Sequence, residues 1–288
     1  MDFDILTFLA APFAASLILT GIHAYLGVHV VERGVIFVDL SLAQIAALGA
    51  TIAILLPFTG GDPHGPWVYW ISLVFTFLGA AVFSTIRSRR ARIPQEAIIG
   101  ICYAVASAGA ILAMSRATSE SEHLKDMLVG NILSVSGGEV LKTACLYAGV
   151  GAFHFIFRRQ FLAISLSHGD HEVEGLSVRF WDFLFYASFG FVVTSSVAIA
   201  GVLLVFCYLI VPSVAAMLYA EGIGTRLAIG WSMGTIVSAL GIFLSVKLDL
   251  PTGATMVCTF GLVLVIMALV RPLLLPNGPA KASLKKAA

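Results

Sequence analysis

Charged residues are scarce in this chain of 288 residues. Asp, Glu, Lys and Arg make up 11% of it, whereas soluble domains carry about 25%. Hydrophobic residues make up 59%, and the mean hydropathy is +0.98. A soluble protein would need far more polar surface, and a membrane β-barrel would show short alternating segments instead of long apolar runs. The composition therefore predicts an all-α polytopic membrane protein with one transmembrane domain over residues 1–288.

The chain also lacks the motifs of nucleotide binding and catalysis. It contains no G-x-x-x-x-G-K-[ST] and no Gly-Lys pair, so any ATP that drives it must bind to another chain. There is no G-x-S-x-G turn for a nucleophilic serine. The segment that begins His171-Glu172 lacks the second histidine of a zinc-protease motif. We therefore expect neither enzymatic activity nor a bound cofactor.

Acidic residues, lysine and arginine are absent from the middle of the apolar runs. Lys142, Asp182 and Arg226 lie near the ends of runs, and Asp39 opens the second run. Ionisable residues inside a membrane often mark a proton relay, so this pattern argues against a proton-coupled pump. It leaves open sodium coupling through backbone carbonyls.

The apolar runs predict about nine transmembrane helices, because about 20 apolar residues cross a bilayer. Leu124–Val135 is a shorter run that is expected to be re-entrant or interfacial. The acidic start of the chain lacks the basic region of a secretory signal, so the first run is expected to be retained. The predicted spans are Leu6–Val28, Val38–Leu56, Trp67–Ile86, Ala97–Met114, Val140–Phe157, Phe180–Ala198, Gly201–Tyr219, Leu227–Val246 and Thr252–Val270.

The basic residues predict the orientation, because cytoplasmic loops carry an excess of Lys and Arg. Three basic regions are expected in the cytoplasm, whereas residues 57–66 and 115–126 are expected outside. Nine spans then place the N-terminus outside and the C-terminus in the cytoplasm. The basic regions are Arg87 to Arg92, Arg158-Arg159, and the tail 271–288 with Arg271, Lys281, Lys285 and Lys286.

Small residues recur at helical spacing in two of the spans. Such spacing lets helix backbones approach closely, so we expect packing seams there. The seams are predicted at Ala43, Ala47, Gly49, Ala50 and Ala53 of the second span and at Gly100, Ala104 and Ala108 of the fourth.

A polar patch opens the second span. Ser41 and Gln44 share a helix face because they are three residues apart, and Asp39 is offset from them. The patch can line a transport pathway or make hydrogen bonds between helices.

The span Gly201–Tyr219 contains a proline. Pro212 cannot donate a backbone hydrogen bond, and carbonyls that it frees must be satisfied by neighbours or by a water-lined cavity. The segment Val205–Ser213 is therefore a candidate pathway wall or hinge, or else a tolerated kink. With Ser41, the candidate pathway or hinge residues are Gly201, Pro212 and Ser213.

A polar segment separates the fifth and sixth spans. It holds His168, Asp170, His171, Glu172 and Glu174. Asp170 would be a good N-cap for a short helix, and such a cytoplasmic helix could dock on a partner. A metal-sensing site of histidines and carboxylates and a solvated loop are the other interpretations.

Four stretches, taken together and in order, resemble the membrane permeases of ABC importers for zinc, manganese and iron. They are Gly27-VHVVERGVIFVDLSLAQIAALG, Leu128-VGNILSVSGGEV, Asp170-HEVEGL with Gly201-VLLVFCYLIVPSVAAML, and Leu248-DLPTGATMV.

The resemblance implies a type II ABC importer permease fold in the bacterial cytoplasmic (inner) membrane. Two permease copies would pair, a cytoplasmic ATP-binding subunit would grip a coupling loop at about residues 160–180, and an extracytoplasmic metal-binding protein would deliver the ion. The coupling residues implied are Asp170, His171, Glu172, Glu174 and Gly175.

The chain departs from the family in its second span. The family usually has a histidine where Gln44 stands, and its aspartate position is occupied by Leu40, with Asp39 one residue earlier. Gln is a poorer zinc ligand than imidazole. A metal-contact role for Asp39 and Gln44 is therefore a hypothesis, and the ion is left open.

Three other functions are compatible with the sequence. They are a type II ABC permease for a metal chelate or corrinoid, a sodium-coupled secondary carrier, and a membrane scaffold that transports nothing. The first usually has a tenth span, and the second would need no ATPase partner.

Overall fold

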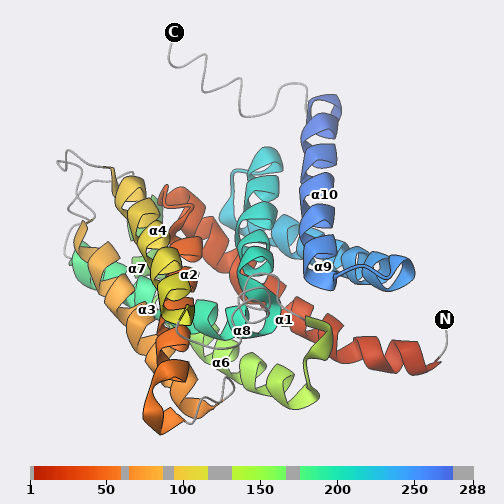
Figure 1. Cartoon of the computed structure of the whole chain (residues 1–288). Coiled ribbons are helices and arrows are strands. Elements are labelled where there is room, and N and C mark those ends of the chain that lie inside the picture. The colour runs from red at the N-terminus through yellow and green to blue at the C-terminus, as the bar shows by residue number, and fades with distance from the viewer. Residues whose placement is uncertain (1–2, 60–64, 87–93, 116–131, 167–175, 275–288) are drawn as a thin grey trace.

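The computed structural model describes residues 3–59, 65–86, 94–115, 132–166 and 176–274. In these ranges the chain is helical, as the composition predicts (Figure 1). The α-helices are α1 (Phe3–Glu32), α2 (Val38–Leu55), α3 (Pro66–Ile86), α4 (Gln95–Met114), α6 (Gly137–Ile156), α7 (Arg158–Leu166), α8 (Val178–Tyr219), α9 (Ile223–Leu248) and α10 (Thr252–Leu274), and the 3₁₀ turns are η1 (Pro57–Thr59) and η2 (Ile132–Ser134).

Several helix ends have a clear local cause. Ser136 caps α6, because its hydroxyl accepts the Glu139 N–H while the Glu139 carboxylate accepts the Ser136 N–H at 2.8 Å; this is a capping box. The α9 helix ends where Asp249 takes a left-handed conformation with φ 52°. Pro251 follows, and because proline cannot continue a helix, the chain turns there and starts α10.

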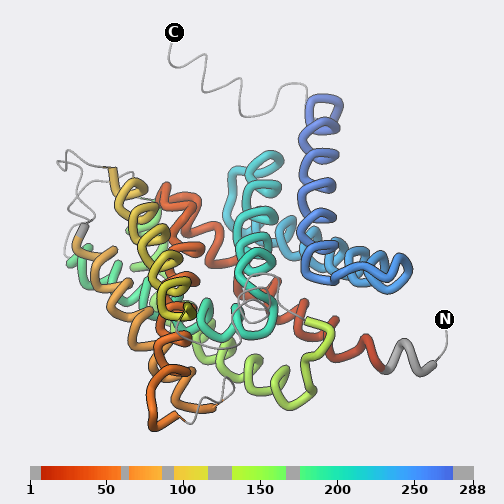
Figure 2. The backbone as a smooth tube through the Cα atoms, in the orientation of Figure 1, coloured from red at the N-terminus to blue at the C-terminus, as the bar shows by residue number. Residues whose placement is uncertain are grey.

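The helix count approaches the nine expected spans when the broken helix α8 is counted as two. Seven helices in the described ranges are long and apolar enough to cross a membrane, or eight if α6 and α7, which meet at 75°, form one broken span. The α8 helix has 42 residues and would be about 63 Å long if straight, twice the hydrocarbon core. Its backbone breaks at Gly201, with φ 74° and ψ 161°, and Figure 2 shows the tube changing direction within α8. Its two arms, 178–200 and 202–219, correspond to the two predicted spans.

The α1 and α8 helices form the centre of the molecule. In Figure 1, α2, α3 and α4 gather on one side of them, and α9 and α10 on the other. The α8 helix supplies many of the largest fully buried side chains, among them Phe185, Tyr186, Phe189 and Tyr208. The α1 and α8 backbones touch, since a Cβ at Gly27 would lie 2.0 Å from the Leu209 carbonyl oxygen.

The predicted seam is confirmed in α2, whereas in α4 the described chain places no helix against it. A Cβ at Gly49 would lie 2.9 Å from the Ser72 Cα of α3, so a small residue is required there. Gly100, Ala104 and Ala108 of α4 are exposed, and the opposite face of α4 packs on the chain instead. Small-residue spacing permits a close neighbour but does not determine that the neighbour belongs to the same chain.

Candidate functional site

The polar patch of α2 is buried inside the helix bundle. Asp39 lies in the first turn of α2, and Ser41 and Gln44 follow within the next turn. Asp39 and Ser41 are 0% exposed and Gln44 is 7% exposed. The α2 helix packs against α3, α4 and α8, so the patch is enclosed by membrane-spanning helices and not by a loop.

The patch is not satisfied by hydrogen bonds within the described part of the chain. Neither carboxylate oxygen of Asp39 has a partner there, and the Ser41 hydroxyl has none. Hydrogen bonding between helices therefore does not account for these two side chains. A buried polar group without a partner costs about 1–3 kcal/mol, and a buried charge costs more. A carboxylate in this position is suited to a cation.

The described residues do not form a complete protein-only metal centre. No group of three or more His, Cys, Asp or Glu side chains that could hold a metal ion occurs in the part of the chain that the structure covers. Asp39 and Gln44 lie on one buried helix, five residues apart and offset around it, and Cys207 of α8 is near enough to Asp39 to interact with its charge.

The three candidate hinge residues of α8 differ in their backbone. Gly201 is the position with non-helical φ and ψ inside α8, whereas Pro212 and Ser213 lie within continuous helix. The Ser213 hydroxyl donates to the Leu209 carbonyl at 2.8 Å and to the Ala24 carbonyl of α1 at 3.4 Å. The geometric break of this segment is therefore at its glycine and not at its proline.

Two sequence predictions fall wholly or partly outside the described ranges. All five coupling residues, Asp170, His171, Glu172, Glu174 and Gly175, lie in the undescribed stretch 167–175. Of the short apolar run Leu124–Val135, the structure describes residues 132–135, where η2 precedes the capped start of α6. The structure does describe the helices on either side of 167–175, which are α7 and α8.

A group of buried histidines is the feature that the charge pattern missed. His23 and His29 of α1 and His154 of α6 are at most 1% exposed. His154 Nε2 lies 2.8 Å from the Ser188 hydroxyl of α8, and His23 Nε2 lies 3.2 Å from the Ser196 hydroxyl. The sequence does mark these positions, because histidine within a membrane span is rare and usually functional. These histidines lie in spans that contain no Asp, Glu, Lys or Arg near their middle.

A second polar group joins α1, α7 and α8. His29 Nδ1 lies 2.8 Å from the Ser165 hydroxyl of α7, which also accepts the Arg33 Nε–H at 2.9 Å. Arg33 forms a salt bridge of 2.5 Å with Asp182 of α8, and its guanidinium lies 3.9 Å above the Phe185 ring. One arginine thus holds the helix before residues 167–175 and the helix after them.

These features define a class of protein. A bundle of membrane-spanning helices with a buried polar patch is the architecture of a transport permease, in which polar residues within the membrane mark substrate pathways. The chain belongs to the ABC 3 transport family, whose sequence profile matches residues 6–271.

Known proteins show the same relationship. The chain is 27% identical over 203 residues to the manganese transport system membrane protein MntC of Listeria innocua, covering 68% of this chain and 72% of that one. It is 24% identical over 242 residues to the chelated iron transport system membrane protein YfeC of Yersinia pestis, covering 84% and 79%. Among solved structures, PsaBC from Streptococcus pneumoniae in complex with Fab matches with a TM-score of 0.76 at 23% identity, covering 98% of this chain and 95% of that one. This structural similarity to PsaBC supports the assignment of the fold.

Proposed function

We propose that this chain is the permease subunit of an ATP-driven importer of a divalent transition metal ion. Family membership and relatives named for manganese and iron transport support the proposal. The observation that carries it is the carboxylate of Asp39, which is fully buried in a membrane helix and has no hydrogen-bond partner among the described residues.

The chemistry of the patch bears on which ion is carried. Asp39, Ser41 and Gln44 offer carboxylate, hydroxyl and amide oxygens, and one sulfur ligand, Cys207 of α8, is close enough to Asp39 to interact with its charge. Oxygen ligands suit manganese, whereas imidazole and thiolate suit zinc. The three oxygen ligands of α2, together with relatives named for manganese transport, favour manganese among zinc, manganese and iron. In this proposal the ion is the cargo, which Asp39 and Gln44 contact during passage.

The remaining parts of the transporter are other chains. A cytoplasmic ATP-binding subunit would hydrolyse ATP and contact Asp170, His171, Glu172, Glu174 and Gly175. An extracytoplasmic metal-binding protein would deliver the ion, and a second permease copy would complete the pathway. The N-terminus would lie outside and the basic C-terminal tail in the cytoplasm. Movement would be accommodated at Gly201, where α8 already departs from helical geometry, with Pro212 and Ser213 on the moving arm.

Reconstitution tests this function. The chain is placed in liposomes with its cognate ATP-binding subunit and binding protein, and uptake of manganese, iron and zinc is measured with and without ATP. We expect ATP-dependent uptake that is highest for manganese and that falls at least about tenfold in Asp39→Asn. Gln44→Leu tests the second ligand. Uptake that follows a sodium gradient without ATP would instead show a secondary carrier.

A further inference from the structure

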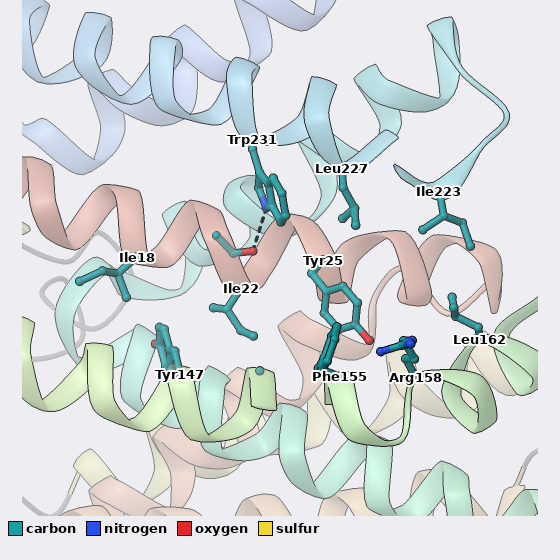
Figure 3. Close-up of a pocket in the computed structure, with 12 residues that line it drawn as sticks. Ile18, Ile22, Tyr25, Tyr147, Phe155, Arg158, Leu162, Ile223, Leu227 and Trp231 are labelled. Carbon is teal, nitrogen blue, oxygen red and sulfur yellow. Dashed lines mark hydrogen bonds between the residues drawn. The ribbon is translucent and has the colours of Figure 1, made fainter. Parts of the chain in front are cut away.

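A groove of about 550 Å³ lies on the membrane-spanning part of the chain, apart from the α2 patch. Figure 3 shows α1 as its floor, α6 and the start of α7 along one side, and α9 along the other. Its volume falls within the range of about 300–1,000 Å³ that is usual for small-molecule sites. Phe155, which is 67% exposed, and Trp231, which is 45% exposed, line it, so the groove is open at the molecular surface.

Two glycines keep the groove free. A Cβ added at Gly21 of α1 or at Gly151 of α6 would meet no atom within 4 Å, although both residues line the groove. Gly27, by contrast, is needed for helix packing. The glycines at 21 and 151 therefore do not bring helices together, and the space that their missing side chains leave is part of the groove.

One side chain of the groove wall is held in place by a hydrogen bond. The Trp231 Nε1–H of α9 donates to the Gly21 carbonyl of α1 at 3.0 Å, as Figure 3 shows. Because the membrane interior offers no water to satisfy such a donor, this bond holds the indole against the wall. A ligand would enter the groove without moving the Trp231 side chain, and such preorganisation favours binding.

One end of the groove carries a positive charge. Arg158 begins α7, one residue beyond the end of α6, and α9 begins near the same end with Ile223 (Figure 3). Arg158 is exposed and lies over the Phe155 ring at 4.5 Å, and it forms no salt bridge with the described residues. The rest of the lining is apolar except for two tyrosine hydroxyls and backbone atoms.

We propose that this groove binds an anionic phospholipid, with an acyl chain along α1 and the headgroup phosphate on Arg158. The occupant must be apolar along the slot and anionic at one end, and a phospholipid is the membrane component that meets both conditions. Arginine favours phosphate through paired, charge-assisted hydrogen bonds, and basic pockets between membrane helices are suited to anionic headgroups. This inference goes beyond transport and does not rest on it.

Native mass spectrometry of the delipidated full-length chain tests the proposal. Phosphatidylglycerol and phosphatidylcholine with identical acyl chains are titrated separately, with inorganic phosphate as a third ligand. We expect one tightly bound phosphatidylglycerol, with a preference over phosphatidylcholine of about fivefold. Arg158→Gln should abolish the preference. Gly151→Leu, which fills the groove, should weaken the binding of both lipids.

Matched variants keep the test decisive. Gly149→Leu lies on the same helix, also meets open space and does not line the groove, so lipid binding should be unchanged. Gly21→Leu fills the groove from α1 and replaces Gly151→Leu if that variant does not fold. An unchanged preference in Arg158→Gln, or wild-type lipid binding in both filled variants, overturns the proposal. So does binding of inorganic phosphate alone at Arg158, or loss of a dimer in the filled variants without loss of lipid, which would assign the groove to a second copy.

Discussion

The Arg33 guanidinium, just after α1, and the Asp182 carboxylate of α8 form a salt bridge of 2.5 Å, with side chains that are 1% and 0% exposed. The α1 helix ends at Glu32, one residue before this arginine, and the α8 helix begins at Val178. Because both side chains are buried away from water, neither charge can be solvated, and each one depends on the other for compensation. Removing one of them leaves an uncompensated charge.

We therefore predict that Asp182→Ala lowers the free energy of unfolding by about 3–5 kcal/mol. Arg33→Met in the same chain should recover part of this loss, because it removes the unpaired charge. Denaturant unfolding in detergent, followed by tryptophan fluorescence, measures both effects. If the double variant is as unstable as the sum of the two single variants, the pair is not coupled.

Gly27 provides a packing test. The contact with the Leu209 carbonyl leaves no room for a methyl group, so Gly27→Ala should destabilise the chain by about 1–3 kcal/mol. Gly261→Ala on α10 is the control, because its Cβ would meet nothing within 4 Å. It should be neutral or slightly stabilising, since Ala is the better helix former. Equal thermal stabilities of the two variants would contradict the close α1–α8 contact.

Gly201 provides a backbone test. Its φ of 74° and ψ of 161° fall in a region that is open essentially to glycine alone. Gly201→Ala should cost about 1–3 kcal/mol of stability. Pro212→Ala, which lies where α8 is helical, should cost less. A larger loss for the Pro212 variant would show that the break at Gly201 is not the strained point of α8.

Asp39 separates stability from transport. Replacing a buried carboxylate that lacks a partner with the neutral amide of Asn should raise the free energy of unfolding by about 1–3 kcal/mol, because a charge costs more to bury than a neutral polar group. The same change should reduce metal uptake. If Asp39→Asn lowers stability, the carboxylate has a structural partner, and its assignment to the pathway is wrong.

The sequence predicted the helices well because the signal for a span is local. Long apolar runs, the Ser136 cap and Pro251 are each read within a few residues, and the structure has helices at all nine predicted spans. The break in α8 is marked only by Gly201 within a continuous apolar run, so its sharpness could not be inferred.

The buried polar groups could be predicted only in part. The patch on α2 is visible because Asp39, Ser41 and Gln44 stand in one short segment. Its burial without partners depends on the surrounding helices, and so it needed the structure. The contacts of His29 and His154 join residues that are far apart in sequence; Ser165, for example, is 136 positions from His29. No single-span pattern identifies such pairs.

The contact at Gly27 also limits how the molecule can move. Main-chain atoms of α1 and α8 meet there with no intervening layer of side chains, and close-packed backbones cannot adapt by changing rotamers. During any conversion between outward-open and inward-open shapes, this part of the two helices must travel as one unit. With the hinge proposed at Gly201, the 202–219 arm of α8 and the packed part of α1 would change their angle to residues 178–200 together.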